Sequence, residues 1–161
     1  MTYEPSPIML INNGHAIEFE YEAGSSIEVN GTAYELKQFH FHGQSEHTLN
    51  GKRYPLEVHL VHQSEAGDYV VVGVLFEAGS ESSFLANFSD NLPAIKGEEY
   101  ITSDTLDAID LIPANAGYYN YQGSLTTPPC SQTVNWFVLK TPLQASAAQL
   151  QNFTTILKDN Y

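Results

Sequence analysis

Aromatic and β-branched residues alternate with polar ones in two short stretches of this chain, residues 38–42 and 57–62. Alternation over five or six positions is typical of β-strands. Residues two apart share a face of a strand, so His40 and His42 point to one side and the neighbouring phenylalanines point to the other. His59 lies on the second predicted strand. If the two strands are neighbours in one sheet, the three imidazoles converge on one point.

Three converging imidazoles indicate a metal site. Three neutral imidazoles and one open position form the ligand set of a catalytic zinc centre, whereas a cysteine-rich set is typical of a closed structural site. Ligating histidines also need a partner for the second ring nitrogen. Gln38 shares the face of His40 and His42, and Glu57 shares the face of the third histidine, so both are candidates. The alternative is a His-x-His pair on the surface or in a hydrogen-bonded core.

The charge balance limits the partners of this chain. It has 19 Asp and Glu residues against 6 Lys and Arg, which gives a formal net charge of −13. Phosphate binding needs clustered cations, so nucleic acid is not an expected partner. No apolar run approaches the ~20 residues that cross a bilayer, and no basic and then apolar leader opens the sequence, so we expect no membrane partner. The length of 161 residues suits a single domain, 1–161.

Cys130 is the only cysteine. One thiol cannot form an internal disulfide, so Cys130 either is a reduced, buried residue or has its partner outside this sequence. A nucleophilic role is not favoured, because the residue follows two prolines and no histidine is near it in sequence.

Short strands joined by tight turns predict a β-dominated fold. Asn-Gly, a strong signal for a hairpin turn, occurs at 13–14, 30–31 and 50–51. Residues 69–76 are almost wholly apolar, which predicts a central strand beside the two histidine strands. Residues 133–140 predict another strand. Together these features favour one antiparallel sheet.

Two segments have the apolar spacing of a helix. Residues 82–92 form the first, which stops before a proline. Residues 146–158 form the second, with Ser146 as the N-cap. Residues 104–112 fit either a short strand or a turn of helix. We therefore expect one or two peripheral helices.

Four motifs carry a resemblance to a known family. They are Asn-Asn-Gly-His-Ala at 12–16, Gln-Phe-His-Phe-His with Ser-Glu-His at 38–47, Glu-Val-His-Leu-Val-His at 57–62, and Gly-Ser-Leu-Thr-Thr-Pro-Pro-Cys at 123–130. Together they resemble an α-class carbonic anhydrase of the bacterial type, over essentially the whole chain. The resemblance implies that family's fold, which is mainly β. It has a large, twisted, mostly antiparallel central sheet with an active-site cleft and a few short peripheral helices.

The resemblance also implies roles for the residues at matching positions. His40, His42 and His59 would be the zinc ligands, and Gln38 and Glu57 would hold their second ring nitrogens.

Further roles concern the catalytic cleft. Glu46 and Thr126 would form the hydrogen-bonded pair that orients the zinc-bound hydroxide, and His15 would be the proton shuttle. Thr127 would shape the polar side of the pocket. The apolar wall that holds carbon dioxide would consist of Val61, Val71, Leu125, Val134 and Trp136.

The implied function is the zinc-dependent, reversible hydration of carbon dioxide to bicarbonate and a proton. Bound Zn²⁺ lowers the pKa of water from about 15.7 to about 7, so hydroxide exists at neutral pH. Thr126 would donate to ionised Glu46 and accept from the hydroxide, which aims a lone pair at the carbon. The partners would be carbon dioxide and bicarbonate, with a homodimer left open. The resemblance implies a periplasmic or secreted location, although this sequence shows no signal peptide.

The ends of the chain differ from the family pattern. Family members have an upstream region with a cysteine that pairs with the one matching Cys130, and they continue past a helix that here ends near Tyr161. We therefore expect a chain that is incomplete at both ends, with a complete ligand set.

Two alternatives remain at this point. One is a carbonic-anhydrase-like fragment that binds metal but turns over weakly or not at all. The other is a cupin-like metal oxygenase, because His40-x-His42-x-x-x-Glu46 imitates a cupin motif in which the glutamate is a ligand.

Overall fold

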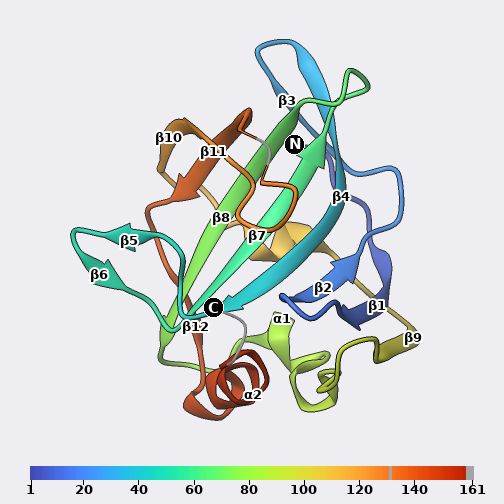
Figure 1. Cartoon of the computed structure of the whole chain (residues 1–161), viewed down its shortest axis with the longest axis vertical. Helices are drawn as coiled ribbons and strands as arrows, with labels where there is room; N and C mark the ends of the chain where they lie inside the picture. Colours follow the sequence, from blue (N-terminus) through green and yellow to red (C-terminus); the bar gives the residue numbers. More distant parts are fainter. Residues whose placement is uncertain (131, 159–161) are drawn as a thin grey trace.

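The computed structural model describes residues 1–130 and 132–158, so Tyr161, near which the last helix was expected to end, lies outside the described residues. Within these ranges ten strands form one sheet in the order β10-β11-β8-β7-β4-β2-β1-β9, with β12 beside β8 and β3 beside β4 (Figure 1). The strands are β1 (Ser6–Asn12), β2 (Ile17–Glu20), β3 (Ser26–Val29), β4 (Thr32–Gly43), β7 (Leu56–Gln63), β8 (Tyr69–Ala78), β9 (Glu99–Leu106), β10 (Tyr118–Gly123), β11 (Val134–Leu139) and β12 (Leu143–Ala145).

The predicted fold class is confirmed. The chain is mainly β, and the large twisted sheet is mostly antiparallel, although β11 and β12 both pair parallel with β8. The two histidine strands are neighbours: β4 and β7 run antiparallel, with His40 opposite His59 and His42 opposite Glu57.

The predicted neighbours of the 69–76 strand are partly wrong. β8 lies beside β7 on one side, and beside β11 and β12 on the other, so β4 does not touch it in the sheet. A continuous apolar run shows that both faces are covered, but it carries no information about which strands flank it.

The Asn-Gly turns behave as predicted at 30–31 and 50–51. At both sites the asparagine and the glycine have positive φ: 50° and 82° at the first, 52° and 77° at the second. This is the backbone that type I′ hairpin turns require. The first turn joins β3 to β4. The second joins β5 (Thr48–Leu49) to β6 (Lys52–Arg53), a small separate hairpin.

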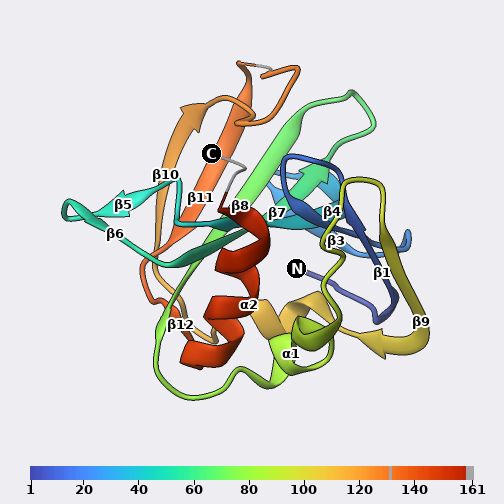
Figure 2. The same ribbon diagram turned by 60° about the horizontal axis from the view of Figure 1, so that its bottom comes forward.

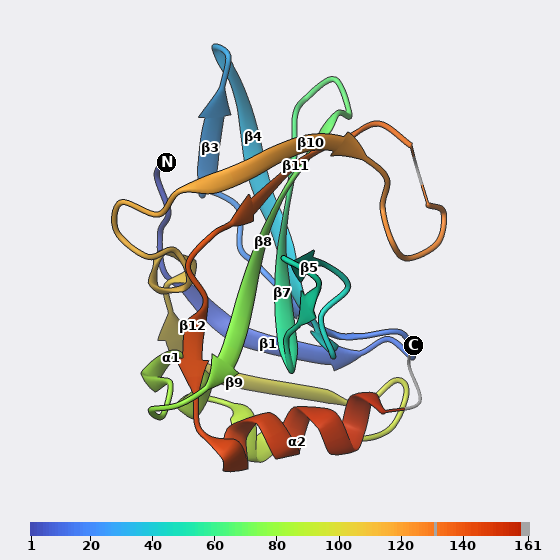
Figure 3. The ribbon, with the colours of Figure 1, turned by 90° about the vertical axis from the view of Figure 1, so that its left-hand side faces the viewer.

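The helices are short and lie together at one side of the molecule (Figures 2 and 3). The segment 82–92 forms one turn of helix, α1 (Ser83–Ala86), and a 3₁₀ turn, η1 (Ser89–Asn91). The undecided segment 104–112 holds the end of β9 and a 3₁₀ turn, η2 (Ala108–Leu111). The last helix, α2 (Ala147–Leu157), has the predicted N-cap Ser146, with Gln149 completing a capping box. Among the described residues, no helix has the length and hydropathy needed to cross a membrane.

The two faces of the sheet have different partners. On one face, phenylalanines of the strands pack against those of the helices, including Phe19, Phe41, Phe88 and Phe153. This core anchors β4 from behind, because its phenylalanines alternate with its histidines. The histidines therefore occupy the opposite face of the sheet.

Candidate metal centre

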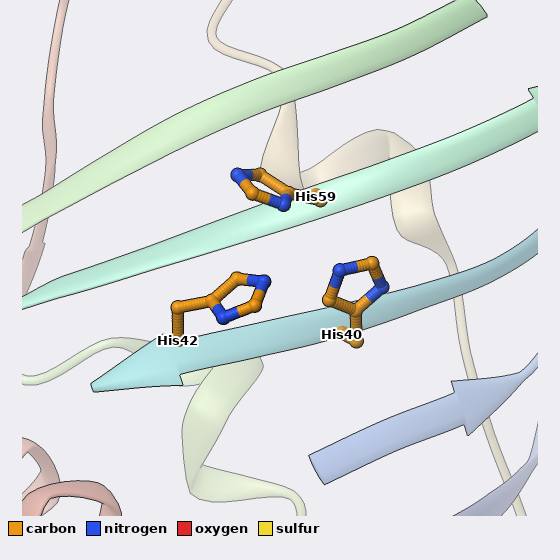
Figure 4. Close-up of side chains that lie close together, drawn as sticks. All are labelled: His40, His42 and His59. Atoms are coloured by element: carbon orange, nitrogen blue, oxygen red, sulfur yellow. The ribbon is translucent and has the colours of Figure 1, made fainter. Parts of the chain in front are cut away.

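The three predicted metal ligands meet on the face of the sheet away from the helices. His40 and His42 come from β4 and His59 from β7, and their rings converge (Figure 4). One ring nitrogen of each lies within 4.8 Å of the others, and all three residues are buried. The period-two spacing on β4 and the antiparallel register with β7 bring them together.

The second nitrogens of two of these histidines have the predicted partners. His40 Nδ1 lies 2.8 Å from Gln38 Oε1, and His59 Nε2 lies 2.5 Å from Glu57 Oε2. In each pair the ring N–H donates to the side-chain oxygen. This fixes the tautomer, so His40 Nε2 and His59 Nδ1 keep a lone pair for a ligand.

The remaining nitrogens fit a metal ion. Burial and the neighbouring histidines lower the pKa of His42 to about 3 and hold the pKa of His40 well below 6.5, so both rings are neutral at pH 7. Neutral imidazole is the form that binds metal. His42 Nε2 is buried without a hydrogen bond, although Glu46 Oε1 lies 3.1 Å away. Buried polar atoms normally have a partner. A metal ion bound by all three imidazoles would give His42 Nε2 a partner and would use the lone pairs of His40 Nε2 and His59 Nδ1.

Glu57 is held from two sides. Besides His59, it accepts from His47 through Nδ1 at 2.6 Å and through the backbone N–H at 2.9 Å. Burial alone would raise the pKa of Glu57, but the electrostatic interaction with His59 and the hydrogen bonds from His47 and His59 lower it well below 4.5. The carboxyl group of Glu57 is therefore ionised, and its hydrogen bond fixes the orientation of the His59 ring.

His47 was not given a role by the sequence. Its Nε2 accepts from Tyr121 Oη at 2.5 Å, which links Glu57 to β10. The sequence signal is the proximity of His47 to the first histidine strand. Its contact with Glu57 spans 10 residues, but its contact with Tyr121 spans 74 and depends on how the sheet is assembled.

Glu46 and Thr126 form the predicted pair. Thr126 Oγ1 donates to Glu46 Oε1 at 2.5 Å, from a loop 80 residues away. The same oxygen is 3.8 Å from His59 Nδ1, so the pair lies beside the nitrogens that could hold a metal ion. Thr126 engages this carboxylate, and neither of the two groups of potential ligands among the described residues, His40-His42-His59 and His47-Glu57-His59, includes Glu46. The cupin-like alternative, in which Glu46 is a ligand, therefore has no support.

Apolar side chains from three strands form a second cluster next to the histidines. It comprises Val61, Val71, Val134, Trp136 and Val138, with Tyr69 and Leu125 packed against it. Leu125, Val61, Val71 and Trp136 line a cavity of about 280 Å³ together with His40 and His59. Val134, which was also predicted for this wall, belongs to the cluster and is buried, but it is not among the residues that line the cavity.

The polar side of the cleft carries the remaining predicted residues. His15, Thr126 and Thr127 line the 280 Å³ cavity and also an adjoining one of about 510 Å³, which reaches His42 and Glu46. His15 is exposed, in the turn between β1 and β2. Glu18, which the sequence did not single out, also lines the first cavity. Burial and Glu20 raise the pKa of Glu18 to about 7, while a hydrogen bond from Asn13 opposes the shift.

A large β-sheet with three convergent imidazoles at a cleft is typical of a protein that can hold a metal ion. Comparison with known proteins specifies the family: the model of eukaryotic-type carbonic anhydrase matches residues 1–161, and the chain belongs to this family. A carbonic anhydrase of Nostoc sp. is 41% identical over 159 residues, 98% of this chain and 60% of that protein. One of Neisseria gonorrhoeae is 41% identical over 155 residues, 96% of this chain and 61% of that protein.

Solved structures agree with this assignment. The Photobacterium profundum α-carbonic anhydrase superposes with a TM-score of 0.93 at 40% identity, over 98% of this chain and 73% of that one. The enzyme of Thermovibrio ammonificans, solved with the inhibitor sulfanilamide, gives 0.89 at 38% identity, over 98% and 73%. The chain spans about three fifths of the length of the Nostoc sp. and Neisseria gonorrhoeae carbonic anhydrases.

Proposed function

We propose that this protein is a zinc-dependent carbonic anhydrase that interconverts carbon dioxide and bicarbonate. The observation that carries the proposal is the convergence of three buried imidazoles beside the Thr126–Glu46 pair. Membership of the carbonic anhydrase family supports it.

Zinc is the metal we propose for His40, His42 and His59, because three neutral imidazoles with an open position are the ligand set of a catalytic zinc centre. When bound, the ion supplies a nucleophile at neutral pH by lowering the pKa of a water molecule. Gln38 and Glu57 keep the imidazoles turned toward it and raise their basicity.

Thr126 orients the attacking group in the cleft. Its only proton is donated to Glu46, so its oxygen is left to accept a hydrogen bond from a group in the cleft. A nucleophile held by this acceptor has its O–H turned toward Thr126 and a lone pair turned toward the substrate. Such orientation accelerates a reaction by removing unproductive geometries.

The apolar wall holds the substrate. Carbon dioxide carries no charge and little polarity, so Val61, Val71, Leu125 and Trp136 offer it dispersion contacts without a hydrogen-bonding group. His15 is exposed and lines the same cavity, so it relays to solvent the proton that the reaction releases.

Further parts of this proposal concern the whole protein. A single domain over 1–161, a periplasmic or secreted location and a homodimer remain proposals, supported by kinship with the bacterial enzymes alone.

The test is carbon dioxide hydration by the purified chain, measured by stopped flow with a pH indicator. The proposal predicts activity that a chelator removes and that zinc restores. A chain that takes up zinc but stays inactive would be the weak or inactive metal-binding fragment, and would contradict the proposed activity.

A further inference from the structure

Glu18 places a carboxylate on the wall of the candidate cleft. It lies on β2 directly opposite His40 of β4, and it lines the 280 Å³ cavity. Among the described residues that line this cavity, Glu18 is the sole acidic side chain, and there is no lysine or arginine. The rest of the lining is apolar or neutral apart from the histidines.

The carboxylate of Glu18 is fixed by an uncharged partner. Asn13 Nδ2 donates to Glu18 Oε2 at 3.1 Å. The carbonyl oxygen of Asn13 accepts from the backbone N–H groups of His15 and Ala16, both at 2.8 Å, which holds the asparagine in the turn. Within residues 1–130 and 132–158, no cation lies within ion-pair distance of Glu18. Above its pKa of about 7, Glu18 is therefore a negative charge that Asn13 holds in place and that no cation of the described residues neutralises.

A negative charge with no cation beside it, on the wall of a cleft, discriminates between anionic and uncharged ligands. Charges interact more strongly where the surroundings are less polarisable than water, and apolar side chains form one wall here. A negative ligand that approaches the three imidazoles is repelled by Glu18, whereas a molecule without net charge is not.

We propose that Glu18 is a specificity-determining residue that weakens the binding of anions at the three-histidine site and leaves uncharged ligands unaffected. This inference rests on the proposed function, in which the substrate is neutral carbon dioxide and the product is anionic bicarbonate. Glu18 then favours release of the product, and it lowers the affinity for small inhibitory anions. The Thr126–Glu46 pair orients the reacting groups, and Glu18 favours uncharged ligands over anions.

The test compares anion binding by the intact chain and Glu18→Gln. Glutamine has the same shape, and its amide oxygen still accepts from Asn13, so the turn is preserved. Each protein is loaded with Co²⁺, the metal is counted, and azide is titrated at pH 8.5 while the visible spectrum of the cobalt is followed. Carboxyl groups are ionised at this pH even when half-buried. Imidazole serves as the uncharged ligand.

A matched control removes the same charge elsewhere. Glu28 is exposed on β3 and lines neither part of the cleft, so Glu28→Gln changes the net charge equally. We expect azide to bind Glu18→Gln about 3- to 10-fold more tightly than the unaltered chain, with no change for Glu28→Gln or for imidazole.

Two results would overturn the inference alone. One is an azide affinity that stays within twofold in Glu18→Gln while cobalt binds normally. The other is an equal change for azide and imidazole, which would mark a change of structure rather than of charge. A chain that binds no metal would overturn the proposed function, and the inference with it. Counting the metal first separates these cases.

Discussion

Individual side chains determine how the three imidazoles are presented. The sequence predicts His40, His42, His59, Gln38 and Glu57 correctly as a spatial group, because strand parity alone decides which residues share a face. The contacts of His47 and Glu18 depend on how loops fold and which strands are neighbours, so strand parity could not predict them. His47 reaches Glu57 only because the loop after β4 folds back. Glu18 reaches the cleft only because β2 lies beside β4.

The pairing of Thr126 with Glu46 predicts a separation between metal binding and turnover. Glu46→Gln and Thr126→Val each remove the ionic hydrogen bond of the pair but none of the three imidazoles. We expect both variants to keep one metal ion per chain and to lose about 10²-fold in the rate of carbon dioxide hydration. Metal analysis and stopped-flow kinetics on the same samples measure the two effects. Loss of the metal from Glu46→Gln would show that Glu46 is a ligand.

The contact of His47 with Glu57 predicts an effect on affinity. In His47→Phe the buried carboxylate of Glu57 loses two of its hydrogen-bond donors if the loop shifts, and one if it does not. We expect unfolding to become easier by about 1–3 kcal/mol and metal affinity to fall at least 10-fold. His15→Phe is the control, because His15 is exposed and is not in contact with Glu57. Equal metal affinities in the two variants, measured by competition with a chelator, would argue against a role for His47.

At the level of elements, alternation and turn signals predicted most strands, and the N-cap Ser146 predicted the start of α2. The order of the strands was harder to predict. β8 has apolar residues on both faces, so its sequence could not show that β11 and β12 flank it instead of β4. The segment 82–92 contains buried apolar residues at helical spacing, yet it forms only a turn of α-helix followed by a 3₁₀ turn.

Close packing between β7 and β8 gives Gly73 a specific role. Gly73 lies opposite His59, and a Cβ there would be 3.3 Å from Glu57 Oε2 and 3.8 Å from the rings of His59 and Trp136. We expect Gly73→Ala to displace Glu57 and weaken metal binding by about 10-fold, as loss of an orienting partner does.

A suitable comparison is Gly79→Ala, just beyond β8. Its Cβ would meet the end of the flexible Gln144 side chain, away from the histidines. Chelator competition on both variants would refute a role for Gly73 if their metal affinities were the same.

For the whole molecule, the buried histidines predict how stability depends on pH. Burial lowers the pKa of His62 to about 4 and that of His42 to about 3, and the pKa of His40 is also well below 6.5. Between pH 6.5 and 4 the unfolded chain binds protons at these three residues, and the folded chain does not. Glu18 has the opposite effect, because its pKa of about 7 in the folded chain lies above that in the unfolded chain.

The destabilisation from protonating three histidines in the unfolded chain is larger than the stabilisation from protonating Glu18 in the folded chain. The free energy of unfolding therefore falls as the pH falls. We expect the metal-free protein to lose roughly 3 kcal/mol of unfolding free energy between pH 7.5 and pH 5. Urea denaturation with a chelator present measures this change. A midpoint that is constant or higher at pH 5 would contradict the prediction.

The most direct test of the metal site is the zinc content of the chain and of two histidine variants after dialysis. His42→Ala removes a proposed ligand, whereas His62→Gln changes a buried histidine on the other face of β7, where it contacts Tyr3. We predict one zinc ion per chain in the unaltered protein and in His62→Gln, and none in His42→Ala. Full retention of zinc by His42→Ala, or no zinc in the unaltered chain, would contradict the assignment of the three-histidine site.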